Sequence, residues 1–356
     1  MRRRNFLKNT SSASVMGLLM PSLPVFSSVF NEMRFGIAEA SYMQRRYAKL
    51  ESKTYPAFTN SLEMIEYSAS VGFGGMQFSV RGWDKDYAKK VRTRVEELDV
   101  FLEGQISLPK NKADVSRFES EVEGAKIAGI DTLRTACLSG RRYETFKTND
   151  AFVEFRKASE TSLKMSEAIV KKHKIRLAVE NHKDWRIEEM LQVLSKLDKE
   201  WIGVTLDTGN NIALLEDPME VVKALAPYSF SVHLKDMGIE EYEDGFLLSE
   251  VNLGEGYLDI PEMVKTIKRS NPDIRFNLEM ITRDPLKIPC LTDIYWETFD
   301  NISASQFAGF LHNLKKAGSK KDLPNISGNS VDDRLALETK NNQYSLNYAK
   351  NILGFS

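Results

Sequence analysis

The stretch that decides the fold is Arg176-Leu177-Ala178-Val179-Glu180-Asn181-His182, where a short apolar run ends in a carboxylate, an amide and an imidazole. An apolar run of this length, between a helical pattern and a polar turn, is typical of a strand buried on both faces. The polar group then lies at the carboxyl end of the strand. The same pattern recurs downstream three times, at Ile202–Asp207, Phe230–Asp236 and Arg275–Glu279.

The spacing of these strand ends indicates parallel strands joined by helices. Glu180, Asp207, His233 and Glu279 follow one another at intervals of 27, 26 and 46 residues, enough for a helix and its loops in each case. Four more apolar runs alternate with helical patterns upstream. Eight strands and eight helices predict a (β/α)₈ TIM barrel. A doubly wound sheet is the alternative, but the chain has neither GxGxxG nor GxxxxGK[ST].

The expected elements fill most of the chain. Strands are predicted at 33–38, 75–80, 100–107 and 132–138 besides the four described, and helices at 60–71, 85–98, 115–128, 150–174, 187–197, 217–226, 261–269 and 302–316. Two loops exceed the minimal repeat, namely the first, at 39–59, and the eighth, at 281–301. We therefore expect a barrel over 31–316 and a C-terminal extension over 317–356, with a helix near 333–352.

The N-terminus carries a separate signal. Arg3-Arg4-Asn5-Phe6-Leu7-Lys8 matches the twin-arginine export pattern, and the weakly apolar stretch at 13–20 is too short to span a bilayer. Residues 1–30 are thus predicted to be a twin-arginine export signal, which implies a periplasmic protein with no stable membrane span. The alternative is a leader that is merely basic.

Composition narrows the range of partners. The chain has 356 residues, a net charge of −1 and a hydrophobic share of 42%, and no basic block follows the leader. A packed core is therefore expected, whereas binding to nucleic acid is not. The sequence leaves the oligomeric state open, a homo-oligomer included.

The four strand ends have the composition of a metal site. If the barrel closes, Glu180, Asp207, His233 and Glu279 supply three oxygen donors and one nitrogen donor. This set favours Mn²⁺ as the one divalent cofactor, with Mg²⁺, Co²⁺ and Zn²⁺ as alternatives. Three carboxylates around such an ion leave one negative charge, so a neutral ligand such as a sugar is expected. The simpler alternative is structural acids paired with Lys or Arg.

Metal polarisation of a carbonyl acidifies the adjacent C–H bond, and a carboxylate at the edge of the site can remove that proton. Two glutamates on opposite sides of one carbon, Glu180 and Glu279, could give and take protons on opposite faces. Such an arrangement is what epimerisation requires.

The segments VENH, LDTGN, HLKD and LEM, in strands five to eight, resemble the sugar phosphate isomerase/epimerase superfamily with the xylose isomerase-like TIM barrel, and its exported bacterial members in particular. The resemblance covers residues 33–316. It implies metal ligation by Glu180, Asp207, His233 and Glu279, and proton transfer by Glu180 and Glu279 through a metal-bound enediolate. Many ketose 3-epimerases have a second histidine where this chain has Asn210, so the sugar is left open.

Further residues near the strand ends are candidates for binding the substrate. Each has a structural alternative, such as an ion pair for the lysine or packing for the tryptophan. The candidates are His182, Lys235, Asn210, Arg283 and Trp296. Glu103, Gln105 and Arg134 either line the pocket or form buried polar pairs within the barrel.

Three other functions remain as alternatives to an isomerase or epimerase. The nearest is a metal-dependent lyase that eliminates the aglycone of a 3-keto-glycoside after the same proton abstraction. The second is a non-catalytic sugar-binding barrel. An apurinic endonuclease on the same fold would need more histidine ligands than the four histidines of this chain provide.

Overall fold

The computed structural model describes residues 33–46, 51–299, 302–318 and 321–356. The expected export signal lies outside the described residues. Among the helices of those four ranges, none combines the length and apolar character needed to cross a membrane.

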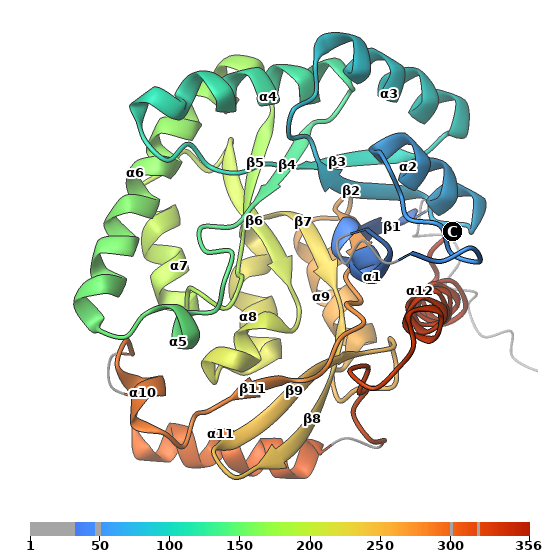
Figure 1. Ribbon diagram of the computed structural model, residues 1–356. Helices are drawn as coiled ribbons and strands as arrows, with labels where there is room; N and C mark the ends of the chain where they lie inside the picture. Colours follow the sequence, from blue (N-terminus) through green and yellow to red (C-terminus); the bar gives the residue numbers. More distant parts are fainter. Residues whose placement is uncertain (1–32, 47–50, 300–301, 319–320) are drawn as a thin grey trace, which may run out of the picture. The chain divides into compact units, whose positions relative to one another are not determined.

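Eight parallel strands form a closed barrel in the order β1-β10-β7-β6-β5-β4-β3-β2 (Figure 1). The predicted (β/α)₈ fold is therefore confirmed. The strands are short and largely buried, as the apolar runs predicted. They are β1 (Phe35–Ala38), β2 (Gly75–Ser79), β3 (Phe101–Gln105), β4 (Thr132–Thr135), β5 (Arg176–Glu180), β6 (Ile202–Asp207), β7 (Ser229–Leu234) and β10 (Arg275–Leu278).

Helices surround the barrel (Figure 1), and several begin at caps that the sequence signals. The Asn60 side chain accepts the N–H of Glu63, and Asp84 accepts that of Tyr87. The helices are α2 (Ser61–Ser70), α3 (Lys85–Leu98), α4 (Val115–Ile127), α6 (Asn149–His173), α7 (Ile187–Leu194), α8 (Pro218–Leu225) and α9 (Ile260–Ser270). Short helices lie in the connections: η2 (Glu39–Tyr42), α1 (Met43–Arg46), η3 (Lys112–Asp114), α5 (Arg142–Thr145), η4 (Asn210–Leu214), η5 (Ala226–Tyr228) and α10 (Asp293–Trp296).

A small antiparallel sheet, which the sequence analysis did not predict, is formed by segments that follow the seventh and eighth barrel strands. It consists of β8 (Asp236–Tyr242), β9 (Gly245–Val251) and β11 (Leu286–Ile288), in the order β11-β9-β8. Helix α11 (Ala304–Ala317) is the helix expected at 302–316, and it lies along this sheet (Figure 1). The rings of Phe246 and Phe310 are 6.0 Å apart, within a second apolar cluster separate from the barrel core.

The C-terminal helix α12 (Val331–Leu353) packs beside β10 and α9, so it covers the eighth strand in place of α11. Its Glu338 carboxylate accepts the backbone N–H groups of Gln44, at 2.6 Å, and Arg45, at 3.2 Å. After the helix, Phe355 packs on Phe35 with ring centroids 4.9 Å apart. These contacts tie the end of the chain to the first strand and the first loop.

Candidate active site

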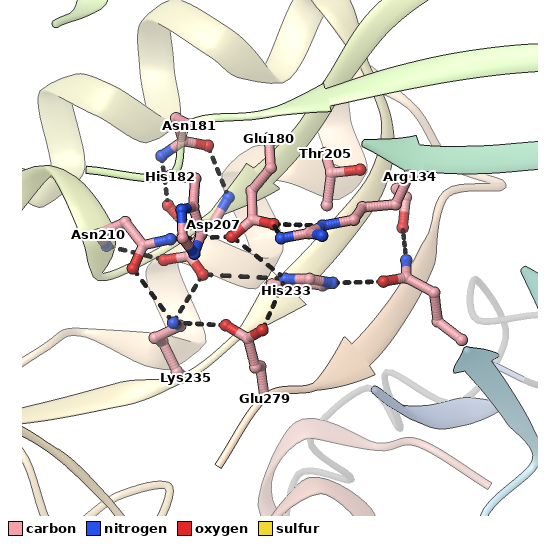
Figure 2. A network of polar contacts seen from close by, with 12 residues as sticks. Arg134, Glu180, Asn181, His182, Thr205, Asp207, Asn210, His233, Lys235 and Glu279 are labelled. Atoms are coloured by element: carbon pink, nitrogen blue, oxygen red, sulfur yellow. Dashed lines mark hydrogen bonds and ion pairs between the residues drawn. The ribbon is translucent and has the colours of Figure 1, made fainter. Parts of the chain in front are cut away.

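The four predicted ligands lie at the ends of neighbouring strands. Glu180 ends β5, Asp207 ends β6, His233 is paired with Asp207 in β7, and Glu279 directly follows β10. All four side chains are buried, with at most 5% of any residue exposed. One ligand atom from each lies within 4.8 Å of the others, so the strand ends converge as the barrel predicted (Figure 2).

The imidazole of His233 lies at the centre of the group. Its Nδ1 atom is 3.6 Å from Glu180 Oε1, 4.0 Å from Asp207 Oδ2 and 3.4 Å from Glu279 Oε1. The other ring nitrogen, Nε2, donates to Gln77 Oε1 at 2.7 Å. The bond to Gln77 therefore fixes the ring with Nδ1 directed toward the three carboxylates.

The imidazole of His233 supports a metal site. His233 Nδ1 makes no hydrogen bond of ordinary geometry, and Asp207 Oδ2 makes none either but lies 2.8 Å from the Lys235 ammonium. Buried polar atoms are rarely left without a partner, because the lost hydration is costly. A divalent cation among the four ligand atoms would give the nitrogen a partner. The residues present thus fit one metal ion, and hard oxygen donors with one imidazole suit Mn²⁺ or Mg²⁺.

Two cations contact the carboxylates directly. Arg134, on β4, donates from Nε to Glu180 Oε2 at 2.5 Å. The Lys235 ammonium lies 2.8 Å from Asp207 Oδ2 and 2.6 Å from Glu279 Oε2, and its side chain is 1% exposed. The structural alternative considered for Lys235, an ion pair, is therefore present, with Asp207 and Glu279 as its nearest partners.

These cations determine the ionisation of the two glutamates. Burial favours the neutral form of Glu180, but Arg134 and His233 outweigh it and hold the pKa of Glu180 well below its ordinary value. Burial likewise opposes the charge of Glu279, while Lys235 and His233 hold the pKa of that carboxyl far below its usual range. Both glutamates are therefore ionised at neutral pH.

The pKa values of Asp207 and His233 move in the other direction. Burial is the main reason that the pKa of Asp207 is raised to about 6, and Lys235 only partly offsets it. Burial disfavours the imidazolium of His233, yet Glu279 and Glu180 outweigh it and raise the pKa of His233 to about 10. Since a metal ligand must be neutral imidazole, metal binding at His233 competes with a proton.

Two asparagines hold the proposed ligands, Asn210 through their carboxylates and Asn181 through the backbone of Asp207. Asn210, in η4, donates from Nδ2 to Glu180 Oε1 at 2.9 Å, and its backbone N–H donates to Asp207 Oδ1 at 2.7 Å. Asn181 accepts the Asp207 N–H at 2.8 Å and donates to the Asp207 carbonyl at 2.9 Å. Asn210 is thus placed to position two ligands, and contact with substrate stays a prediction.

Two other predicted substrate contacts lie near the carboxylates. His182 is partly buried, and its Nδ1 bonds the Leu138 carbonyl at 2.9 Å. Burial lowers the pKa of His182 to about 4, so the ring is neutral, Nδ1 carries the hydrogen and Nε2 is an acceptor. Arg283 forms a two-pronged pair with Glu250, at 2.5 and 3.1 Å, and 21% of its side chain is exposed.

Trp296 has a different environment. Its indole N–H donates to the Cys290 carbonyl at 2.9 Å, and its ring packs edge-on against Tyr295 and Phe307. These contacts belong to the second apolar cluster, beside the small sheet. A role in substrate binding therefore stays a prediction for this residue.

The structure adds residues that the sequence analysis did not assign to the site. One of these residues is Gln77, whose side-chain amide donates a hydrogen bond to Glu103 at 3.0 Å. Alternation along β2 could have placed Gln77 inside the barrel. Lys183 and Glu250 are the other two, and both depend on tertiary structure, since one follows a loop turn and the other lies in the unpredicted hairpin.

Comparison with known proteins gives one family and several similar folds. Residues 65–296 match the model of the family described as xylose isomerase-like TIM barrel. A 3-oxo-isoapionate decarboxylase of Pectobacterium atrosepticum is 32% identical over 104 residues, which are 29% of this chain and 38% of that protein. The match thus spans less than half the length of that relative.

Solved structures resemble the chain in fold at low identity. A D-psicose 3-epimerase determined with D-fructose superposes with a TM-score of 0.59 and 14% identity, covering 90% of this chain and all of the other. A xylose isomerase-like barrel protein of Mycobacterium smegmatis in complex with magnesium gives 0.54 and 12%, covering 80% and 97% of the two chains. At such identities the likeness extends to the fold alone.

Proposed function

The chain belongs to the xylose isomerase-like TIM barrel family, and on this basis we propose that it is a divalent-metal-dependent sugar isomerase or epimerase. The observation that carries the proposal is the convergence of Glu180, Asp207, His233 and Glu279, whose ligand atoms lie within 4.8 Å of one another. These residues would hold the metal, with Mn²⁺ the preferred ion. When bound, the metal polarises the carbonyl of the sugar and acidifies the adjacent C–H bond.

Proton transfer is assigned to the two glutamates. One glutamate, as the carboxylate, removes the proton from the carbon next to the carbonyl. The other, after taking up a proton from solvent, delivers it to the same carbon from the opposite face, and the first then releases its proton to solvent. Glu180 and Glu279 approach His233 from different directions in Figure 2, as this division of roles needs. Arg134 and Lys235 support proton removal because each keeps the carboxylate it contacts in the ionised form that accepts a proton.

The surrounding side chains favour a fixed geometry. Asn210 holds Glu180 and Asp207 through two hydrogen bonds, and Gln77 holds the ring of His233. Because these groups are locked by neighbours before substrate arrives, little reorganisation is needed during the reaction.

A lyase is the second candidate, favoured by the partial match to a decarboxylase. The same proton removal beside a ketone, followed by departure of a group from the next carbon, gives elimination. A 3-keto-glycoside would lose its aglycone in this way. Export to the periplasm, proposed from the twin-arginine pattern at residues 3–8, would suit such breakdown of glycans.

Deuterium incorporation tests the proposal. The purified protein is incubated with Mn²⁺ in D₂O and a panel of ketoses and oxo-sugars, and the products are analysed by NMR. We expect deuterium at a carbon next to a carbonyl, with exchange lost in Glu180→Gln and in Glu279→Gln. Glu200→Gln, at an exposed position, is the matched control.

The outcomes separate the candidates. Exchange without a new unsaturated product indicates an isomerase or epimerase, whereas an unsaturated product with ultraviolet absorbance indicates the lyase. If the metal-loaded protein produces neither with any sugar of the panel, the proposal is refuted.

A further inference from the structure

Lys183 is a buried cation without a carboxylate partner. Only 3% of the residue is exposed. Its ammonium donates to the side-chain oxygen of Asn210, a neutral acceptor, and among the described residues it takes part in no ion pair. A buried charge is costly unless an opposite charge compensates it. The positive charge of Lys183 is therefore not balanced by a paired carboxylate.

The backbone of Lys183 is also unusual. Its φ angle of 60° lies in the left-handed region, which lysine adopts at a cost of about 1 kcal/mol. The Lys183 carbonyl accepts the N–H of Arg142 at 3.1 Å, which helps to hold this conformation. Strain at a buried, uncompensated charge is typical of functional positions rather than of structural ones.

Lys183 lies beside two other cations of the site. The Lys235 ammonium also donates to Asn210 Oδ1, at 3.3 Å, so this one amide oxygen accepts hydrogen bonds from both lysines. Glu250 connects Lys235, 3.9 Å away, with Arg283, which it binds at 2.5 Å. The partly exposed Arg283 therefore extends the group toward the surface.

With a metal bound, the net charge of the site is positive, whereas the sequence had suggested a negative charge. Five carboxylates, Glu180, Asp207, Glu279, Glu250 and Glu103, face the four cations Arg134, Lys183, Lys235 and Arg283. With His233 neutral and the carboxylates ionised, their sum is −1, and a divalent metal would leave one positive charge. The sequence alone suggested one negative charge, because it did not reveal these cations around the ligands.

We propose that Lys183, together with Lys235 and Arg283, forms a subsite for an anionic group of the substrate, so that the sugar is an acid or a phosphate ester. This inference rests on the proposed function for the identity of the ligand as a sugar. Carboxylate and phosphate share the required chemistry, since each presents charged oxygens that accept hydrogen bonds from ammonium and guanidinium groups.

Binding of unreactive ligands tests the subsite without relying on turnover. Sorbitol, gluconate and sorbitol 6-phosphate share a six-carbon polyol chain and differ in charge. Each is titrated calorimetrically into the full protein with and without Mn²⁺. We expect at least one anion to bind about 10- to 100-fold more tightly than sorbitol, because charge-assisted hydrogen bonds are the stronger ones.

Two variants test whether Lys183 causes the preference for anionic ligands. Lys183→Gln should reduce the preference for the anion to within a few-fold of sorbitol, while Lys89→Gln, on the exposed face of α3, should retain it. Circular dichroism verifies that each variant is folded. The anion that binds more tightly, gluconate or the phosphate, identifies the charged group.

Two results would overturn the inference: equal binding of sorbitol and both anions to the wild-type protein, or an anion preference that persists in folded Lys183→Gln. Failure here is distinguishable from failure of the proposed function. Deuterium exchange into neutral sugars with no anion preference leaves the enzyme proposal intact, whereas anion preference without exchange into any sugar leaves the subsite intact.

Discussion

His233 Nε2 and Gln77 Oε1 are joined by a hydrogen bond of 2.7 Å, and this bond decides which ring nitrogen faces the carboxylates. Glu103 in turn accepts the Gln77 amide at 3.0 Å, which fixes the orientation of the amide. Hydrogen-bond partners of a ligating histidine hold its ring orientation and raise its basicity. Gln77 is therefore a positioning residue for the candidate metal centre.

Gln77→Leu should weaken Mn²⁺ binding about 10- to 100-fold, because the imidazole can then rotate and Nδ1 is no longer directed at the site. Calorimetric titration of the EDTA-treated protein measures the change. Gln343→Leu, on the exposed face of α12, should bind Mn²⁺ like the wild type. Unchanged affinity in Gln77→Leu would show that the ring is held by the barrel alone.

Lys235 contacts two of the proposed ligands. Its replacement should therefore lower the stability of the metal-free protein much more than that of the metal-bound protein. In Lys235→Met, Asp207 and Glu279 remain buried without their cation, and the free energy of unfolding without metal should fall by about 3–5 kcal/mol. Saturating Mn²⁺ should recover most of the loss, because the ion supplies the missing charge.

Thermal unfolding with EDTA and with Mn²⁺ measures both effects of the Lys235 change. The variant should show a larger rise of Tm on metal addition than the wild type, whereas Lys90→Met, at an exposed site on α3, should match the wild type under both conditions. A variant as stable as the wild type in EDTA contradicts this account of Lys235.

The barrel and the four ligands could be predicted because both follow from local pattern. Short apolar runs such as 176–180 are typical of buried strands, and the carboxyl ends of parallel barrel strands meet on one face. Side chains at those ends, Glu180 and Asp207 among them, therefore converge whatever the loops do.

The features that were not predicted depend on tertiary contacts, which a local sequence pattern does not contain. The β8–β9 hairpin was missed even though Glu243-Asp244-Gly245 marks its turn, because no element was predicted between the strand at 230–236 and the helix at 261–269. Helix α11 resembles a barrel helix in sequence, but its apolar face packs on the hairpin. The position of Glu250 follows from this hairpin, and that of Lys183 follows from the loop between β5 and α7.

The link between α12 and the first loop should contribute measurably to stability. Glu338→Ala removes the acceptor of two backbone N–H groups, from Gln44 and Arg45, that begin α1. Leaving such buried donors unpaired should lower the free energy of unfolding by about 1–3 kcal/mol. Urea denaturation followed by circular dichroism measures the difference.

The control for Glu338 is Lys340→Ala, an exposed position on the same helix, which should change the free energy by less than about 0.5 kcal/mol. If both variants unfold at the same urea concentration as the wild type, α12 does not stabilise the first loop through this carboxylate.

Lys183 should make stability depend on pH, because its charge is unfavourable in the fold. Burial, with the nearby charges of Lys235 and Arg283, lowers the pKa of Lys183 from 10.5 to about 8. The unfolded chain therefore binds more protons than the folded protein between about pH 8 and pH 10.5, and the contribution of Lys183 to stability rises with pH across that window. Below pH 8 the cost of the buried charge is fully present.

Lys183→Met removes the charge while it keeps the length of the side chain. At pH 7 the variant should be more stable than the wild type by up to about 3 kcal/mol, the value of a pKa difference of this size, and the gap should close as the pH rises from 8 to 10.5. Urea denaturation of both proteins at several pH values gives the difference directly, since other titrating groups affect both equally. A gap that is absent at pH 7, or that stays constant up to pH 10.5, would mean that Lys183 is compensated in the folded protein and has no charge to offer a substrate.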